Sequence, residues 1–331
     1  MSAPAHPPPP APMFTLFADI DGSLVHYPDA QSLAELERTA DVLLLPPSTT
    51  GRVGVISRGT LERCARLRDG GARIAIVSGA RTTTLLARLP FLPAADAYVS
   101  ENGGRIFYPD DSGLTAAPLR EDFEWRALLA PVAGPLRQEA LPPAERQGIV
   151  WDYYRALSAA GWRLDASGYS TAFRLLPTPG RGREETAAAI AARPPGLAAS
   201  FNLGVADFYP AASGKEGAAA HLLARWGGAA RAAAHLCDDD NDLPLAALVG
   251  RAFIPGITEA SVSRAIEVDP SHFEVASGRW TDATEEMLDA AAAHFARLAR
   301  GEGAAGGARG GEGGGAGEAA GRQAGRAAAA R

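Results

Sequence analysis

The octapeptide FADIDGSL, residues 17–24, is an apolar segment that runs into two aspartates and a glycine. Residues two apart on a strand point to the same side, so Asp19 and Asp21 can face one ligand beyond the strand end. Gly22 then permits a tight turn that lets the backbone approach that ligand. One carboxylate can attack phosphorus to form an acyl phosphate, while the other exchanges a proton with the leaving oxygen. The alternative is a plain acidic turn after an edge strand.

Strand-like and helix-like segments alternate along the chain beyond this octapeptide. Such alternation favours a parallel sheet covered by helices, and we predict an α/β fold with a Rossmann-like, doubly wound parallel-sheet core. Ligands bind such sheets at the carboxyl ends of the strands, where polar residues cluster in this sequence. The expected elements are strands at 14–19, 73–77, 97–99 and 232–237 and helices at 59–68 and 82–89.

Residues 106–197 differ in composition from the rest of the chain and are predicted to form an inserted α+β cap domain. This stretch holds 10 of the 23 Phe, Tyr and Trp residues in less than a third of the chain and is interrupted by proline pairs at 142–143 and 194–195. The Rossmann-like core is then expected to comprise 13–105 and 198–300.

Both ends are predicted to be disordered. Residues 1–12 are rich in proline, which favours extended chain. Residues 301–331 contain 12 Gly and 11 Ala, which offer little apolar surface to offset the entropy of ordering.

The bulk composition excludes several classes of protein. A net charge of -6 argues against a nucleic-acid or anionic-membrane surface, which concentrates positive charge. No apolar run approaches the roughly 18 residues of a membrane helix. Cys64 and Cys237 are far apart without CxxC spacing, so neither a disulfide framework nor a thiolate metal site is expected. A cytoplasmic location fits best, with organellar targeting left open.

A second acidic segment, CDDDNDLP at 237–244, also follows an apolar strand-like run. Its four aspartates repel one another unless solvent or a cation intervenes. Carboxylate oxygens suit Mg²⁺, which takes one or two carboxylates and keeps water and substrate phosphate as its other ligands. A solvated acidic loop is the alternative.

The segment VSGART, 77–82, turns from a strand into a helix at Ser78. A hydroxyl, backbone N–H groups and Arg81 could together cradle an anion. An ordinary helix N-cap would have the same sequence, and the role of Arg81 stays open.

Arginine supplies 31 of the 32 basic residues, and the single lysine, Lys215, lies in SGKEG at 213–217. Lysine is a compact cation that can touch a phosphate oxygen and an aspartate together, whereas the planar fork of arginine needs more room. A functional position is favoured over a chance surface lysine.

These segments resemble, in order and content, the four motifs of the haloacid dehalogenase-like superfamily. The matching residues are DIDGS at 19–23, Ser78-Gly79, Lys215 and DDDND at 238–242. SENGGRIF at 100–107 and the insertion before the third motif look like the subclass with a large α/β cap, the Cof-like and sucrose-phosphatase-like branch.

The resemblance implies a role for each matching residue. Asp19 would be the nucleophile and Asp21 the general acid and base, with Lys215 offsetting charge around Asp19. Implied phosphate contacts are Ser78, Gly79, Lys215 and Asn241, and implied Mg²⁺ ligands are Asp19, Asp21 through its main-chain carbonyl, Asp238 and Asp242.

Motifs and resemblance together predict an enzyme, a Mg²⁺-dependent phosphatase of small phosphate monoesters, sugar phosphates above all, with an aspartyl-phosphate intermediate. Two alternatives stay open. One is a phosphosugar mutase, similar to phosphomannomutase, and the other is a catalytically silent sugar-phosphate-binding protein. The expected partner is a small phosphorylated metabolite, with no nucleic acid or membrane, and the expected assembly is a monomer or weak dimer.

Specificity is expected to lie in the cap, which can close over the core and touch the leaving group. Asn102 and Arg174 are the predicted substrate contacts. Trp151, Tyr153 and Tyr154 could also reach a sugar, but aromatic residues at this spacing are equally suited to packing a helix on a sheet.

Overall fold

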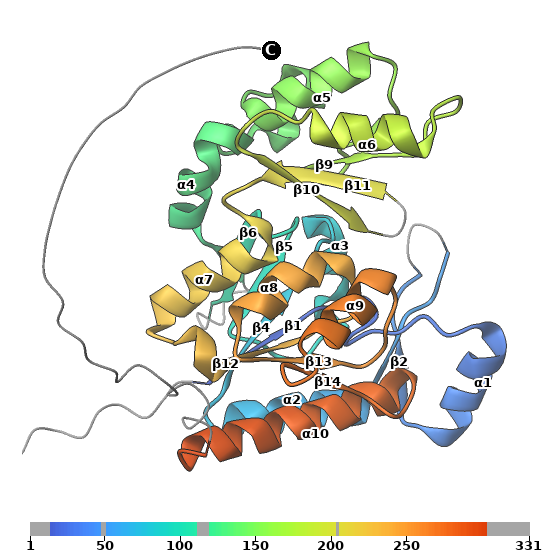
Figure 1. The fold of residues 1–331 in the computed structure, drawn as a ribbon, viewed down its shortest axis with the longest axis vertical. Helices are drawn as coiled ribbons and strands as arrows, with labels where there is room; N and C mark the ends of the chain where they lie inside the picture. The colour runs from blue at the N-terminus through green and yellow to red at the C-terminus, as the bar shows by residue number, and fades with distance from the viewer. Residues whose placement is uncertain (1–13, 48–50, 111–118, 203–204, 303–331) are drawn as a thin grey trace, which may run out of the picture.

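The computed structural model describes residues 14–47, 51–110, 119–202 and 205–302 (Figure 1). The segments predicted to be disordered, 1–12 and nearly all of 301–331, lie outside these residues.

An eight-stranded sheet forms the core, with strand order β14-β13-β12-β1-β4-β5-β6-β7. Neighbouring strands from β14 to β5 are parallel, whereas β6 and β7 are antiparallel additions at one edge. The predicted α/β class with a mostly parallel sheet is therefore confirmed. The strands are β1 (Thr15–Ala18), β4 (Arg73–Val77), β5 (Ala97–Ser100), β6 (Arg105–Pro109), β7 (Leu119–Glu121), β12 (Ala233–Leu236), β13 (Arg251–Ile254) and β14 (Phe273–Val275).

Helices cover both faces of this sheet because successive strand residues point to opposite sides. Leu16 and Ala18 of β1 pack in the cluster that includes α2 (Arg58–Asp69) and α10 (Trp280–Ala299), which lie side by side in Figure 1. Phe17 points the other way, toward α7 (Gly214–Trp226) and α8 (Leu243–Leu248).

The remaining elements of the core are short. They are α1 (Ala30–Thr39), the hairpin β2 (Val42–Leu44) and β3 (Val55–Ser57), α3 (Thr82–Arg88), α9 (Ala260–Val268) and the 3₁₀ helices Leu89–Phe91, Ala230–Ala232 and Asp240–Asp242. Both cysteines of the chain, Cys64 and Cys237, are buried free thiols. None of the described helices is long and apolar enough to cross a membrane.

A second layer lies above the core in Figure 1 and contains a four-stranded antiparallel sheet of order β10-β11-β9-β8. We call this layer the cap. Its elements are α4 (Phe123–Ala133), α5 (Ile149–Ala159), β8 (Leu164–Asp165), β9 (Phe173–Leu175), α6 (Arg183–Ala191), β10 (Leu197–Asn202), β11 (Val205–Pro210) and the 3₁₀ helices Gln138–Ala140 and Pro143–Glu145.

The two sheets correct the predicted boundaries of the insertion. The expected limits were 106 and 197, but β6 and β7 extend the core sheet and β10 and β11 belong to the cap sheet. The insertion therefore begins after β7 and extends through β11. The physical reason is that each of these strands joins its sheet through an antiparallel neighbour, and such pairing does not show in the strand's own residues.

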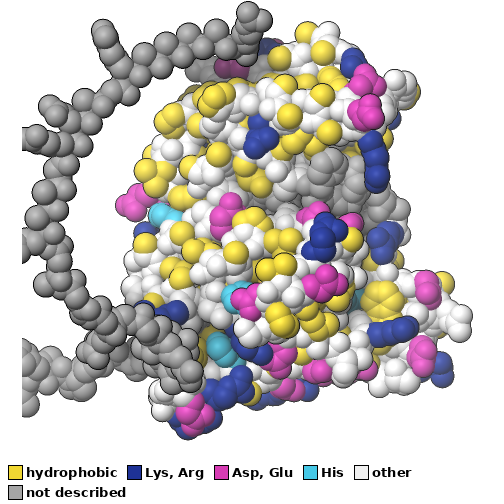
Figure 2. Space-filling view, viewed as in Figure 1, with side chains coloured by type: hydrophobic (Ala, Val, Ile, Leu, Met, Phe, Trp, Pro, Cys, Tyr) yellow, Lys and Arg dark blue, Asp and Glu magenta, His cyan; other side chains and the backbone are white. Residues whose placement is uncertain are grey.

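The cap aromatics are packing residues, one of the two roles considered for them. Trp151 is fully buried, and its indole N–H donates to the Ala133 carbonyl over 2.9 Å. Tyr153 and Tyr154 pack edge-on against Phe208 and Phe173. On the molecular surface, Figure 2 shows acidic and basic side chains interspersed with apolar ones over both the cap and the core.

Candidate active site

Three adjacent strands end at one cavity. In the sheet β1 lies between β4 and β12, and Asp19, Ser78 and Asp238 follow their carboxyl ends. The cavity has a volume of about 430 Å³ and lies between the core and the cap. Its lining includes six predicted site residues of the core, Asp19, Asp21, Ser78, Gly79, Asp238 and Asn241, and one of the cap, Arg174.

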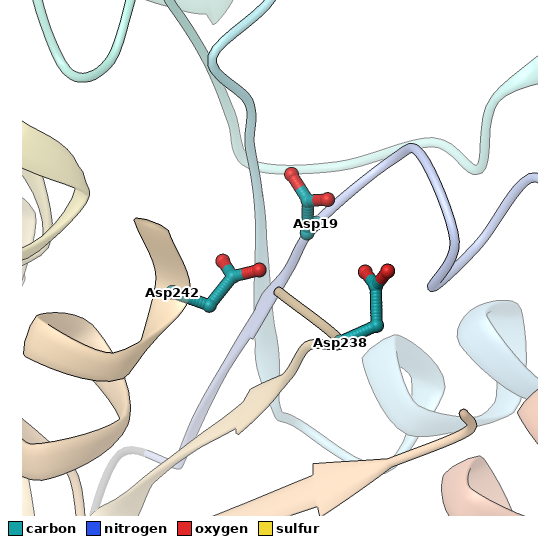
Figure 3. Close-up of side chains that lie close together, drawn as sticks. All are labelled: Asp19, Asp238 and Asp242. Atoms are coloured by element: carbon teal, nitrogen blue, oxygen red, sulfur yellow. The ribbon is translucent and has the colours of Figure 1, made fainter. Parts of the chain in front are cut away.

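Three buried carboxylates converge beside this cavity (Figure 3). Oxygen atoms of Asp19, Asp238 and Asp242 lie within 4.8 Å of one another. The ammonium group of Lys215 donates to Asp19 Oδ1 over 2.8 Å and to Asp242 Oδ1 over 2.7 Å. The structure thus joins residues of the first, third and fourth motifs in one cluster.

Gly22 explains how the two acidic segments approach so closely. Its φ of +86° favours glycine, and a Cβ atom built there would lie 2.0 Å from Asp238 Oδ2. Next to it, the Ser23 hydroxyl donates to Asp238 Oδ1 over 2.9 Å. The turn after β1 is therefore shaped around the Asp238 carboxylate.

The cluster carries more negative than positive charge. Burial raises the pKa of Asp19 to about 7; Lys215 opposes this rise and Asp242 adds to it. Burial, followed by the charges of Asp19 and Asp242, raises the pKa of Asp238 well above its ordinary value. Burial alone would lower the pKa of Lys215, but the charges of Asp19 and Asp242 outweigh burial and raise it.

This donor set fits Mg²⁺. One lysine faces three buried carboxylates, so a divalent cation would relieve their mutual repulsion. The ligands on offer are hard oxygen atoms, and the adjoining cavity leaves room for water and phosphate.

Asp21 lines the same cavity, but its side chain does not belong to the three-carboxylate cluster. Its Oδ1 accepts Arg88 Nη1 over 2.7 Å and the Tyr27 hydroxyl over 2.5 Å. The predicted contact of its main-chain carbonyl with Mg²⁺ stays a prediction. Sequence reasoning did not single out Tyr27 or Arg88.

The segment after β4 divides its contacts between cavity and cap. Ser78 is buried, and its Oγ accepts the Ala80 N–H over 3.0 Å, as in a turn that leads into a helix. Arg81 points to the cap, where it forms an ion pair with Asp165 and lies over the Tyr169 ring, 5.3 Å from its centroid. Arg81 therefore links core and cap.

The two predicted substrate contacts meet on one buried carboxylate, that of Asp207 in β11. Arg174 makes a bidentate pair with Asp207, with Nε–Oδ1 2.7 Å and Nη2–Oδ2 3.1 Å. Asn102 Nδ2 donates to Asp207 Oδ2 over 3.2 Å. Arg174 lines the cavity, but Asn102 does not, so the observed role of Asn102 is to join core and cap.

Glu101, the residue before Asn102, makes the densest set of contacts between core and cap. Its buried carboxylate accepts the backbone N–H and hydroxyl groups of both Ser170 and Thr171, and the Thr82 hydroxyl from the core. Both Glu101 and Asn102 have positive φ, which fixes the tight turn after β5. Tyr169, the cap residue directly before Ser170, lines the cavity.

No family model and no curated protein sequence matches the chain. Several solved structures, by contrast, are similar to it in fold. The sucrose-phosphatase from Synechocystis sp. PCC6803, in complex with sucrose and phosphate, is 15% identical over 86% of this chain and 98% of that one, with a TM-score of 0.56. The protein 0175 from Thermoplasma acidophilum is 14% identical over 85% and 99%, with a TM-score of 0.55.

The HAD subclass IIB sugar phosphatase BT4131 is 14% identical over 86% of this chain and 99% of that one, with a TM-score of 0.52. The chain is thus an α/β protein with an inserted cap. Its acidic site, the cluster of three carboxylates and one lysine, lies at the strand ends of the core sheet and beneath the cap. The fold of the chain is similar to that of these solved structures, one of which is described as a HAD (haloacid dehalogenase) phosphatase, so the fold that the resemblance implies is confirmed.

Proposed function

We propose that the protein is a Mg²⁺-dependent phosphatase that hydrolyses small phosphate monoesters, sugar phosphates in particular. The observation that carries this proposal is the contact of Asp19 with Lys215 beside two further buried carboxylates, at the wall of an open cavity. The similarity in fold to sucrose-phosphatase and to BT4131 supports it.

In the first step a carboxylate oxygen of Asp19 attacks phosphorus and the bond from phosphorus to the leaving oxygen breaks. The electron pair of that bond stays on the leaving oxygen, which takes a proton from the Asp21 carboxyl group. The product alcohol leaves, and the phosphoryl group is held on Asp19 as an acyl phosphate.

In the second step water attacks phosphorus and gives a proton to the Asp21 carboxylate. The acyl phosphate bond breaks, inorganic phosphate leaves and the Asp19 carboxylate is restored. Lys215 stabilises the charge on the phosphoryl oxygens in both steps. Asp19, Asp238 and the main-chain carbonyl of Asp21 would hold Mg²⁺ with Asp242 beside them, and the ion would polarise the phosphoryl group.

A phosphate-release assay tests this proposal on sucrose phosphate, hexose phosphates and nucleotides, with and without EDTA. We expect release that requires Mg²⁺ and is abolished in Asp19→Asn, a variant that keeps the side-chain shape. Phosphate release also excludes a pure mutase. Comparable activity in Asp19→Asn would reject the covalent mechanism, and ligand binding without release in Mg²⁺ would indicate a silent binding protein.

A further inference from the structure

We propose that Tyr27 and Arg88 are positioning residues for Asp21 and hold its carboxylate in one orientation at the cavity wall. This inference rests on the proposed function, because it assigns these side chains a part in proton transfer to the leaving oxygen. Neither residue belongs to the four motifs.

The three side chains form a closed triangle of hydrogen bonds. Arg88 Nη1 and the Tyr27 hydroxyl both donate to Asp21 Oδ1, over 2.7 and 2.5 Å. Arg88 Nη2 donates to the Tyr27 hydroxyl oxygen over 2.5 Å. Both donors thus bind the same carboxylate oxygen. Oδ2 has no hydrogen bond from the described residues, which leaves it to exchange a proton with a ligand.

Arg88 is fixed by the core. Its side chain is only 10% exposed, and it lies in the last turn of α3, the helix that begins four residues after Ser78. One short helix therefore connects the expected phosphate-binding segment to the expected acid. A buried guanidinium moves little, so the oxygen that it binds is held in place as well.

Tyr27 is held from two directions. Arg52 donates from Nη2 to the Tyr27 carbonyl over 3.0 Å and lies 4.8 Å from the ring centroid. Arg88 lies 5.9 Å from the same centroid. Tyr27, Arg52 and Arg88 all line the cavity together with Asp21.

The alternative is an ordinary surface ion pair between Arg88 and Asp21. Such a pair would explain one contact, but not the hydrogen bonds that Tyr27 makes to both residues. Exposed pairs contribute about 0–1 kcal/mol and leave their side chains free to reorient. A general acid must stay within hydrogen-bond reach of the leaving oxygen, and small displacements are costly. The triangle supplies that restraint to Asp21, which lies three residues after the end of β1 and directly before the turn at Gly22.

Substrates with different leaving groups distinguish a positioning role of Tyr27 from a purely structural one. Proton donation matters for an alkoxide such as that of a hexose phosphate and much less for 4-nitrophenolate, a stable anion. For Tyr27→Phe we expect kcat/KM, which reports the steps up to departure of the leaving group, to fall roughly 10- to 100-fold on a hexose phosphate. With 4-nitrophenyl phosphate we expect kcat/KM to change by less than about threefold.

A double-mutant cycle completes the experiment. In an Asp21→Ala background, Tyr27→Phe should have almost no further effect on the hexose phosphate, because the group that Tyr27 positions is gone. Arg88→Lys should retain more activity than Arg88→Met, since lysine keeps one donor. Tyr154→Phe, in the cap and outside this cavity, is the matched control and should behave as wild type.

Equal losses of kcat/KM on both substrates, or additive effects in the cycle, would overturn the positioning role while leaving the phosphatase intact. A wild-type protein that hydrolyses none of the esters would reject the proposed function and this role with it. Tyr27→Phe keeps the shape of the side chain, so the decisive comparison does not depend on whether the buried Arg88 tolerates replacement.

Discussion

Thr171 of the cap donates twice to the carboxylate oxygen Oε2 of Glu101 in the core, from its backbone N–H over 2.8 Å and from its hydroxyl over 2.7 Å. Ser170 adds its own backbone N–H over 2.9 Å. A single core carboxylate therefore anchors the cap loop that carries Tyr169 to the cavity. Because the carboxylate is buried, water does not replace these donors while the cap stays in place.

Replacing Glu101 by glutamine should loosen this anchor. Even with its oxygen in the place of Oε2, the amide is an uncharged and weaker acceptor, and it turns an N–H group toward the Thr82 hydroxyl that donates to Oε1 in the wild type. We expect the free energy of unfolding to fall by about 2 kcal/mol, measured by chemical denaturation. Glu124→Gln, at a side chain that is 84% exposed, is the control and should be neutral. Equal stability of the two variants would contradict an anchoring role.

Lys215→Arg should abolish most of the activity although it conserves charge. The ammonium group sits between Asp19 and Asp242 with 1% of the side chain exposed, and a guanidinium does not fit that space. We expect kcat to fall at least about 100-fold. The reverse exchange at the exposed Arg120 should leave kcat unchanged. Retention of activity in Lys215→Arg would disprove the requirement for a compact cation.

Mg²⁺ should stabilise the folded protein, and Asp238→Asn should remove most of that effect. At a free Mg²⁺ concentration one hundred times Kd, binding raises the free energy of unfolding by about 2.7 kcal/mol, which raises Tm by several degrees. Asp240→Asn is the matched control, because Asp240 lies in the same loop but outside the carboxylate cluster. Thermal melts with and without Mg²⁺ measure the shift. A Tm shift that survives in Asp238→Asn would place the ion elsewhere.

Acid should destabilise the protein through His26. Burial lowers the pKa of His26 from 6.5 to about 4, and its Nε2 lies 2.7 Å from the Thr284 hydroxyl. Between these pH values the unfolded chain takes up a proton that the native state does not, so stability falls as pH falls. The full effect is roughly 3 kcal/mol.

His26→Gln tests this contribution, because glutamine can bind Thr284 and does not titrate. The difference in unfolding free energy between wild type and variant should change across pH 6.5 to 4, with wild type losing more. Taking the difference cancels the groups common to both proteins. Parallel curves over this range would show that His26 does not contribute.

Local patterns predicted much of the core. The strand expected at 73–77 is observed with the same limits, and the helix expected at 59–68 runs over Arg58–Asp69. The helix is bounded by residues that act through their neighbours in the chain. One is Ser57, whose side chain caps the helix, and another is Gly70, which ends it.

Other features depend on partners remote in the sequence. Which sheet receives β6 or β10 is decided by pairing across the fold, so the cap limits were misplaced. Arg88 had no distinguishing signal, because one more arginine among 31 is unremarkable in this chain. Asp207 did have one: an acid within the apolar strand VADFYP, buried there and paired with Arg174.

The single lysine makes the site accessible to a very simple spectrum. Selective ¹⁵N labelling of lysine would place one side-chain reporter in the whole protein, at the ammonium group between Asp19 and Asp242. No second ε-ammonium exists to overlap with it. Binding of a cation, a phosphate or a substrate at the carboxylate cluster would then be followed as the movement of one resonance, in the intact chain and without mutation.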